Sequence, residues 1–117
     1  MPSTGLHGPY ALTAQNIDAV VGKSIGTYAL TREASGQQFV VRYVGRSDSD
    51  VNKRLKDYVG TTYLEFKYGH FPSAKAAFEH ECRMFHDFGE EKLLDNDIHP
   101  RRPDGSGWKC PSCKIFG

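Results

Sequence analysis

The chain has 117 residues, of which 38% are hydrophobic and 25% are charged, so its length favours one small domain and excludes a multidomain enzyme. Fifteen Lys and Arg residues stand against fourteen Asp and Glu residues, and the net charge of +1 excludes strong nucleic-acid binding through total charge alone. No apolar run reaches the roughly 18 residues of a membrane span, and the start lacks the features of a signal peptide, so we expect a soluble, cytoplasmic protein with no membrane partner.

The N-terminal segment, residues 1–22, has weak hydrophobic patterning and is interrupted by several Gly and Pro residues. Its one regular stretch runs from Thr13 to Val21 and predicts a short helix with Thr13 as the cap. We interpret this segment as an appendage to a core that spans residues 25–88.

Two segments rich in β-branched and aromatic residues, Ile25 to Arg32 and Phe39 to Val44, are predicted strands. The short link between them contains Gly36, which tolerates a positive φ, so the pair is typical of a β-hairpin. Gly45 follows directly and is expected to end the second strand.

Helix signals replace strand signals after the hairpin. The polar run SDSD offers cap residues for a helix from Val51 to about Tyr58, and Arg54 lies at the edge of the apolar stripe of this helix. Thr62 to His70 then alternates between two faces, which is typical of a third, half-buried strand.

A long helix is predicted from Ser73, which is expected to be its N-cap by residue type, to about Phe88. At about 100° per residue, Glu81 falls in the middle of the apolar stripe of this helix, whereas Glu79 points almost the opposite way. A buried carboxylate is costly unless it is paired. Glu81 is therefore either half of a structural ion pair, for example with Arg54, or a metal ligand or catalytic acid in a cleft.

The order hairpin, helix, strand, long helix predicts a small α/β (α+β) domain with a mainly antiparallel three-stranded sheet flanked by helices. Residues 89–117 contain too few apolar side chains for a core of their own. This tail is therefore expected to be disordered, packed on the domain, or held by a metal ion. We treat residues 1–117 as a single domain.

Four groups of residues, in this order along the chain, resemble the GIY-YIG nuclease domain: Gly26-Thr27-Tyr28, Tyr43-Val44-Gly45, Arg54 and Glu81. The resemblance covers residues 25–88. It departs from the family pattern at Thr27, where the family has Ile, and in a spacing to Arg54 that is one residue longer. The family often has an Asn late in the domain, for which Asn96 is a weak candidate, and several members have a His near the position of Tyr58.

The resemblance implies a metal-dependent endonuclease that hydrolyses phosphodiester bonds in DNA. It implies that Tyr28 takes the proton from the attacking water and that Tyr43 orients that water or the phosphate. Each tyrosine by itself is also typical of a strand core. A phenol needs a nearby cation to act as a base, because its ordinary pKa is about 10.

The other candidate residues supply charge. Arg54 can bind a phosphate oxygen with its planar guanidinium, and the single carboxylate of Glu81 can hold Mg²⁺ or Mn²⁺ with water as the remaining ligands. Gly45 and Arg46 are candidate substrate-binding residues in a segment, residues 42–56, where five basic residues stand against two acidic ones. The alternative function is a non-catalytic nucleic-acid-binding module, or a zinc-stabilised interaction module, that keeps the nuclease fold.

The three cysteines predict a second metal. Cys110 and Cys113 form a Cys-x-x-Cys pair, while Cys82 and His86 share one face of the long helix. Together they are typical of a tetrahedral structural zinc site whose fourth ligand is either His86 or His99. The alternative is a free Cys82 with a reactive or disulfide-bonded Cys110–Cys113 pair.

Overall fold

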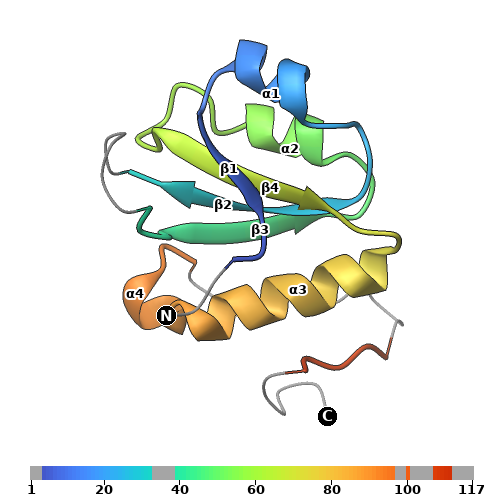
Figure 1. The fold of residues 1–117 in the computed structure, drawn as a ribbon. Helices are drawn as coiled ribbons and strands as arrows, with labels where there is room; N and C mark the ends of the chain where they lie inside the picture. The colour runs from blue at the N-terminus through green and yellow to red at the C-terminus, as the bar shows by residue number, and fades with distance from the viewer. Residues whose placement is uncertain (1–3, 33–38, 97–99, 101–106, 112–117) are drawn as a thin grey trace.

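The computed structural model describes residues 4–32, 39–96, 100 and 107–111. These ranges contain, in chain order, β1 (His7–Ala11), α1 (Ala14–Val20), β2 (Gly26–Thr31), β3 (Tyr43–Ser47), α2 (Val51–Lys56), β4 (Glu65–His70), α3 (Ala74–Asp87) and α4 (Glu90–Leu93). Figure 1 shows the strands as one sheet, with α1 and α2 on one side of it and α3 on the other. The predicted α+β class is confirmed.

The sheet has four strands in the order β1-β4-β2-β3, and every neighbouring pair is antiparallel. The predicted count of three was wrong because β1 was not recognised as a strand. Its sequence, HGPYA, has no alternating apolar pattern, and only Tyr10 of its residues is partly buried. Backbone pairing with β4 holds β1 at the edge of the sheet, where strands tolerate Gly and Pro.

Residues of the N-terminal segment that the structure describes, 4–22, pack into the core together with residues of the predicted core, 25–88. α1 begins after Thr13, whose side chain accepts a hydrogen bond from the backbone of Asn16, as the sequence predicted. Ile17 and Val21 are buried in the same cluster as the strand residues. The Asn52 side chain then donates to the carbonyl of Val21 at 2.8 Å, which joins α1 to α2.

The second strand of the hairpin lies further along the chain than predicted. β3 begins at Tyr43 and runs through Gly45 to Ser47, so Gly45 stands within the strand and does not end it. Gly45 pairs directly with Tyr28 on β2. A Cβ atom at position 45 would overlap the Cζ and Oη atoms of Tyr28, so the absence of a side chain lets the ring lie across β3.

The predicted caps are confirmed, although two element boundaries differ. Asp50 caps α2 by accepting from the backbone of Lys53, and α2 ends at Lys56, before the predicted end at Tyr58. Ser73 caps α3. The third predicted strand is β4, which starts at Glu65.

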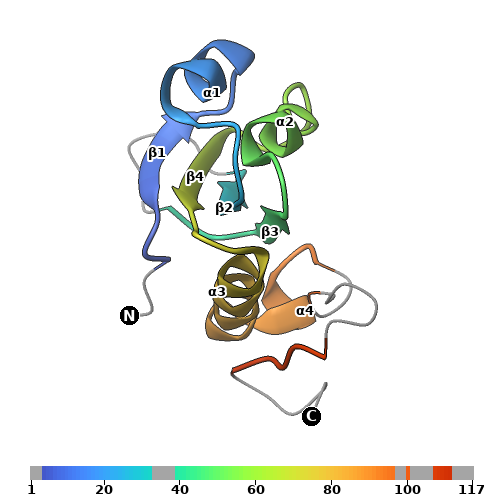
Figure 2. The same cartoon turned by 90° about the vertical axis from the view of Figure 1, so that its right-hand side faces the viewer.

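Side chains on the two faces of the sheet form two cores. The face toward α1 and α2 buries Ile17, Tyr28, Leu30, Val51, Leu55 and Phe66, and the face toward α3 buries Ala29, Val44, Met84 and Phe85. Figure 2 shows the sheet between α1 and α2 on one side and α3 on the other. β3 is an edge strand, so residues of both layers approach the surface along it.

Within the described ranges, the helices are too short or too polar to cross a membrane. Past α4, the described part of the tail returns to α3, where the ring of Trp108 lies 5.8 Å from that of Phe78. Cys110 is buried beside it. Of the predicted zinc ligands, His99 and Cys113 lie outside the described residues.

Candidate active site

The candidate site lies along β3, where alternate side chains face opposite layers. Tyr43 packs with the core on the α2 side. Val44 packs against α3, and Arg46, two residues later, also reaches α3. The strand therefore presents tyrosine to one layer and arginine to the other, and the site extends around the free edge of the sheet.

A cluster of tyrosines forms the α2 side of the site. The rings of Tyr28 and Tyr43 are nearly parallel, at 15°, with centroids 6.4 Å apart. Tyr58 lies 5.7 Å from Tyr28 and 5.6 Å from Tyr43, and the Tyr28 hydroxyl donates to the Tyr58 hydroxyl at 3.1 Å. Tyr63 extends the cluster, 6.0 Å from Tyr58.

Tyr58 and Tyr63 were not among the four predicted catalytic residues. Tyr58 occupies the position where the resembled family has a His. Tyr63 was not predicted as part of the site, because it precedes β4 and only the fold brings it to Tyr43, with ring centroids 6.1 Å apart. Its hydroxyl donates to Asp95 at 2.7 Å, so it also ties the cluster to the segment after α4.

Arg54 lies on α2 over this cluster. Its side chain is exposed, and its positive charge acts on the buried phenol of Tyr28. The arginine is therefore accessible to an anion in solution.

The phenols on this side are held in the neutral form. Tyr28 is 1% exposed, and burial is the main cause that raises its pKa, followed by Tyr58, while Arg54 acts in the opposite direction. Burial also raises the pKa of Tyr43, with contributions from Tyr58 and from the negative charge of Glu81. Arg54 alone is therefore too little positive charge to ionise either phenol.

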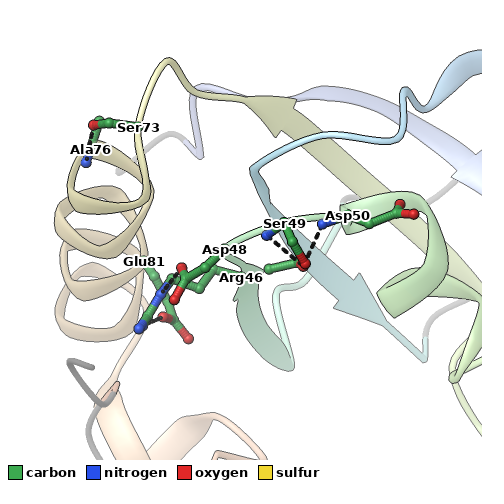
Figure 3. Close-up of polar contacts among 8 residues, drawn as sticks. Arg46, Asp48, Ser49, Asp50, Ser73, Ala76 and Glu81 are labelled. Carbon is green, nitrogen blue, oxygen red and sulfur yellow. Dashed lines mark hydrogen bonds and ion pairs between the residues drawn. The ribbon is translucent and has the colours of Figure 1, made fainter. Parts of the chain in front are cut away.

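Glu81 forms the α3 side of the site. It is 7% exposed, and the Arg46 Nη1 atom donates to its Oε1 atom at 2.7 Å. Arg46 also donates from Nε to the Oδ1 atom of Asp48 at 2.8 Å, and its guanidinium lies 5.1 Å from the ring centre of Phe78. Figure 3 shows the guanidinium between the two carboxylates.

The ion-pair partner of Glu81 is Arg46, whereas the sequence suggested Arg54. Strand alternation explains the difference, because Arg46 and Glu81 share the α3 layer while Arg54 sits on α2. Burial lowers the pKa of Arg46, but Asp48 and Glu81 outweigh it and the net shift is upward. Arg46 therefore stays charged around neutral pH.

Tyr43 connects the two sides, since its phenol feels the charges of both Arg54 and Glu81. The structure brings Tyr28, Tyr43 and Arg54 together on the α2 side of the sheet, whereas Glu81 lies on the α3 side with Arg46. Gly45 has a packing role under the Tyr28 ring, and its role in substrate binding stays a prediction.

Asn96 lies beside the site in a backbone contact. Its Oδ1 atom accepts from the amide of Val44 at 3.0 Å, and its Nδ2 atom donates to the carbonyl of Val44 at 2.8 Å. Asn96 therefore satisfies the free edge of β3 next to Tyr43, a structural task that the sequence could not show.

The donor set on the α3 side suits a hard cation. Carboxylate oxygens are the ligands that Mg²⁺ prefers, and Mg²⁺ commonly uses one or two of them with water. The guanidinium of Arg46 already occupies the space between Glu81 and Asp48, so this position favours positive charge. No group of three or more His, Cys, Asp or Glu side chains that could hold a metal ion occurs within the described ranges.

The predicted zinc ligands that the structure describes lie together, away from the tyrosines. Cys82 and Cys110 are buried and are not in a disulfide. Burial raises the pKa of the Cys82 thiol, and a hydrogen bond with Cys110 adds to this effect. Burial lowers the pKa of His86, but Glu90 and Cys110 raise it and the net shift is upward.

No family model matches the chain, and no curated protein or solved structure compared with it is significantly similar. The family resemblance therefore depends on the residues and their order along the chain, and it stays a prediction.

Proposed function

We propose that this protein is a metal-dependent endonuclease of the GIY-YIG type that hydrolyses phosphodiester bonds in DNA. The observation that carries the proposal is the grouping of Tyr28, Tyr43, Arg54 and Glu81 along β3, with Tyr43 under the influence of both Arg54 and Glu81. Phosphodiester hydrolysis needs an activated water and neutralisation of the charge that develops on the phosphate. These four residues supply groups for both tasks.

Arg54 is the phosphate-binding residue in this proposal. Its side chain is exposed on α2, and its charge acts on the phenol of Tyr28. It can therefore bind a phosphate oxygen and keep that phosphate next to the phenols. A permanent, planar charge is well suited to an oxyanion. Arg46 is a second candidate contact, but in the described structure its guanidinium is engaged by Glu81 and Asp48.

Glu81 would hold a divalent cation such as Mg²⁺ or Mn²⁺. When bound, this cation would supply charge neutralisation at the phosphate and lower the pKa of groups around it. The Oε1 atom of Glu81 accepts from Arg46, so Arg46 would have to share or release this carboxylate. Asp48, the other partner of Arg46, is exposed and can take over the guanidinium.

Tyr28 is the proposed proton acceptor. Its hydroxyl donates to Tyr58, so the proton that must leave before Tyr28 can act as a base can pass to the Tyr58 oxygen while Tyr58 releases its own proton to solvent. Burial favours the neutral phenol. We therefore expect cleavage to increase with pH through the alkaline range, as the small ionised fraction of Tyr28 grows.

One observation favours the alternative of a non-catalytic module that keeps the fold. The Arg46–Glu81 pair, with side chains 11% and 10% exposed, satisfies the buried carboxylate without a metal ion. A protein that only binds nucleic acid or another partner through this edge would need the ion pair and no metal ion.

A plasmid-nicking assay separates the two functions. Purified protein is incubated with supercoiled plasmid and Mg²⁺ or Mn²⁺, beside Glu81→Gln and the control Glu79→Gln, which removes a carboxylate from the same helix. Nicking by the parent and by Glu79→Gln, with none by Glu81→Gln, supports the enzyme. Absence of nicking by the parent with either metal contradicts it.

A cytoplasmic location forms part of the proposal. No disulfide joins Cys82 and Cys110, and unbridged cysteines are usual in a reducing compartment.

A further inference from the structure

The side of α3 that faces the tail has a cavity that the proposed hydrolysis does not use. We call it the Trp108 cavity. Its volume is about 480 Å³, and it is lined by Lys75 and Glu79 of α3 and by Gly107, Trp108 and Lys109 of the tail. Figures 1 and 2 show this described part of the tail, residues 107–111, running beside α3. A cavity of this size falls in the range of small-molecule sites, about 300–1,000 Å³.

The indole of Trp108 is held in the wall of this cavity while part of its surface stays accessible. Its ring packs against the buried cluster of Phe78, Cys82 and Cys110, and the ring centroids of Trp108 and Phe78 lie 5.8 Å apart. Trp108 is nevertheless only partly buried and lines the cavity. An aromatic ring that is positioned by packing and still accessible is a surface on which a nucleobase can stack.

The charged groups of the cavity favour an anionic ligand. Lys75 and Lys109 line it together with the single carboxylate of Glu79, so two positive charges against one negative charge leave a formal charge of +1. Both lysines are exposed and can contact the phosphates on either side of a base in the cavity. A stacking ring beside two ammonium groups suits a nucleotide, which combines a flat base with phosphate.

The Trp108 cavity adjoins the α3 side of the candidate active site. The ring of Phe78 packs with Trp108, and the guanidinium of Arg46 lies 5.1 Å from the centre of the same ring. Arg46 in turn pairs with Glu81 at 2.7 Å. A DNA strand that reaches Glu81 would therefore have a neighbouring nucleotide close to the cavity.

We propose that the Trp108 cavity binds one unpaired nucleotide of a DNA strand, with its base stacked on Trp108 and its phosphates contacted by Lys75 and Lys109. The choice of DNA as ligand rests on the proposed function, although binding here needs neither a metal ion nor catalysis. The nucleotide is unpaired because a base inside a duplex is stacked between its neighbours and does not enter a surface cavity. The substrate class is therefore DNA with a single-stranded segment beside the cleaved bond.

The test uses tryptophan fluorescence, because Trp108 is the only tryptophan in the chain. Full-length protein is titrated with a short single strand of oligothymidylate in EDTA, which prevents metal-dependent cleavage. We expect saturable quenching of the emission as a base stacks on the indole, with a free tryptophan derivative as the control for absorption by the oligonucleotide. A blunt duplex should leave the emission nearly unchanged.

Variants assign the contacts, with binding of a fluorescein-labelled strand measured by anisotropy. Trp108→Ala should weaken binding about 5–150-fold, the range for loss of one stacked base, whereas Trp108→Phe should keep most of the affinity. Lys75→Ala and Lys109→Ala should each lower the salt dependence of binding, by about 0.7 in the slope of log affinity against log salt. Lys92→Ala removes an exposed lysine of α4 and should change neither quantity. The parent titration needs no substitution, so a variant that fails to fold leaves the test intact.

The proposal is overturned if the single strand fails to bind or binds without quenching, if the duplex quenches as strongly as the single strand, or if Lys92→Ala weakens binding as much as Lys75→Ala. The cavity and the nuclease can fail separately. Nicking of plasmid without quenching would remove this site and keep the proposed enzyme, whereas quenching without nicking would keep the site and remove the enzyme.

Discussion

On the α2 side of β3 the buried polar groups are phenols that stay neutral, whereas on the α3 side a buried carboxylate is paired with a guanidinium. Tyr28 is buried without a charged group strong enough to ionise it. Glu81 is also buried, but Arg46 compensates its charge at 2.7 Å. An edge strand can therefore present a phenol and a charged group a few residues apart. The two remain separate because alternate side chains of a strand lie on opposite faces of the sheet.

The largest expected effect is on the charged side. Arg46→Ala leaves the Glu81 carboxylate buried without its partner, so we expect a loss of about 3–5 kcal/mol in the free energy of unfolding. Urea unfolding without divalent metal measures it. Asp48→Asn is the control, because it breaks only the exposed contact of Arg46 and should cost at most about 1 kcal/mol.

Addition of Mg²⁺ sharpens this prediction. If Glu81 holds the cation, Mg²⁺ should restore more stability to Arg46→Ala than to the parent, because the cation no longer competes with a guanidinium. Equal stabilisation of both proteins by Mg²⁺ would argue against a metal site at Glu81.

The next largest effect concerns catalysis on the α2 side. Arg54→Ala should lower the rate of DNA cleavage by ~10²–10³, the range for loss of a charge that stabilises the transition state. The melting temperature should change little, because the side chain is exposed. Lys53→Ala removes a neighbouring positive charge from the same helix and should retain cleavage, whereas similar rates for both variants would refute the role of Arg54.

Packing between the two sides is tested at Gly45. Gly45→Ala should destabilise the protein by about 1–3 kcal/mol, since the new Cβ atom would overlap the Tyr28 ring and hydroxyl. Tyr28→Phe removes the overlapping Oη atom, so the cost of Gly45→Ala should be smaller in that background. A cost that is equal in both backgrounds, measured by urea unfolding, would show that the Tyr28 hydroxyl is not the obstacle.

The neutral state of Tyr28 predicts a loss of stability at high pH. The folded protein has a raised pKa at Tyr28 and keeps this proton, while the unfolded chain loses it above the ordinary value of 10.0. The stabilising effect is therefore complete below pH 10 and declines above it, by about 1.4 kcal/mol per pH unit for this one group. Tyr28→Phe should make the decline shallower in unfolding curves recorded at several alkaline pH values.

The smallest effect is expected at Tyr58. Tyr58→Phe removes the hydroxyl that accepts from Tyr28 at 3.1 Å, which should cost about 0.5–1.5 kcal/mol of stability. If Tyr58 relays the proton of Tyr28 to solvent, Tyr58→Phe should lower the cleavage rate while the affinity for DNA stays the same. Tyr63→Phe, which breaks the hydrogen bond to Asp95, is the matched control at the other end of the cluster.

Local signals in the sequence predicted most of the elements correctly. Each of α1, α2 and α3 begins after a residue whose side chain accepts a hydrogen bond from a backbone amide, namely Thr13, Asp50 and Ser73. This contact joins residues three positions apart, so it can be predicted from the local sequence. The periodicity of α3 also placed Glu81 on the buried face. β1 was not predicted, because an edge strand held by backbone pairing needs no alternation of apolar residues.

The sequence by itself determined which chemical groups are available and in what order, including Tyr28, Tyr43, Arg54 and the cysteines. Only the tertiary structure decided which of them are neighbours. Glu81 pairs with Arg46 and not with Arg54 because the sheet separates α2 from α3, and His86 meets Cys110 because the tail returns to α3. The physical reason is that capping and periodicity depend on residues a few positions apart, whereas charge pairing and metal binding depend on distances that only the packed chain defines.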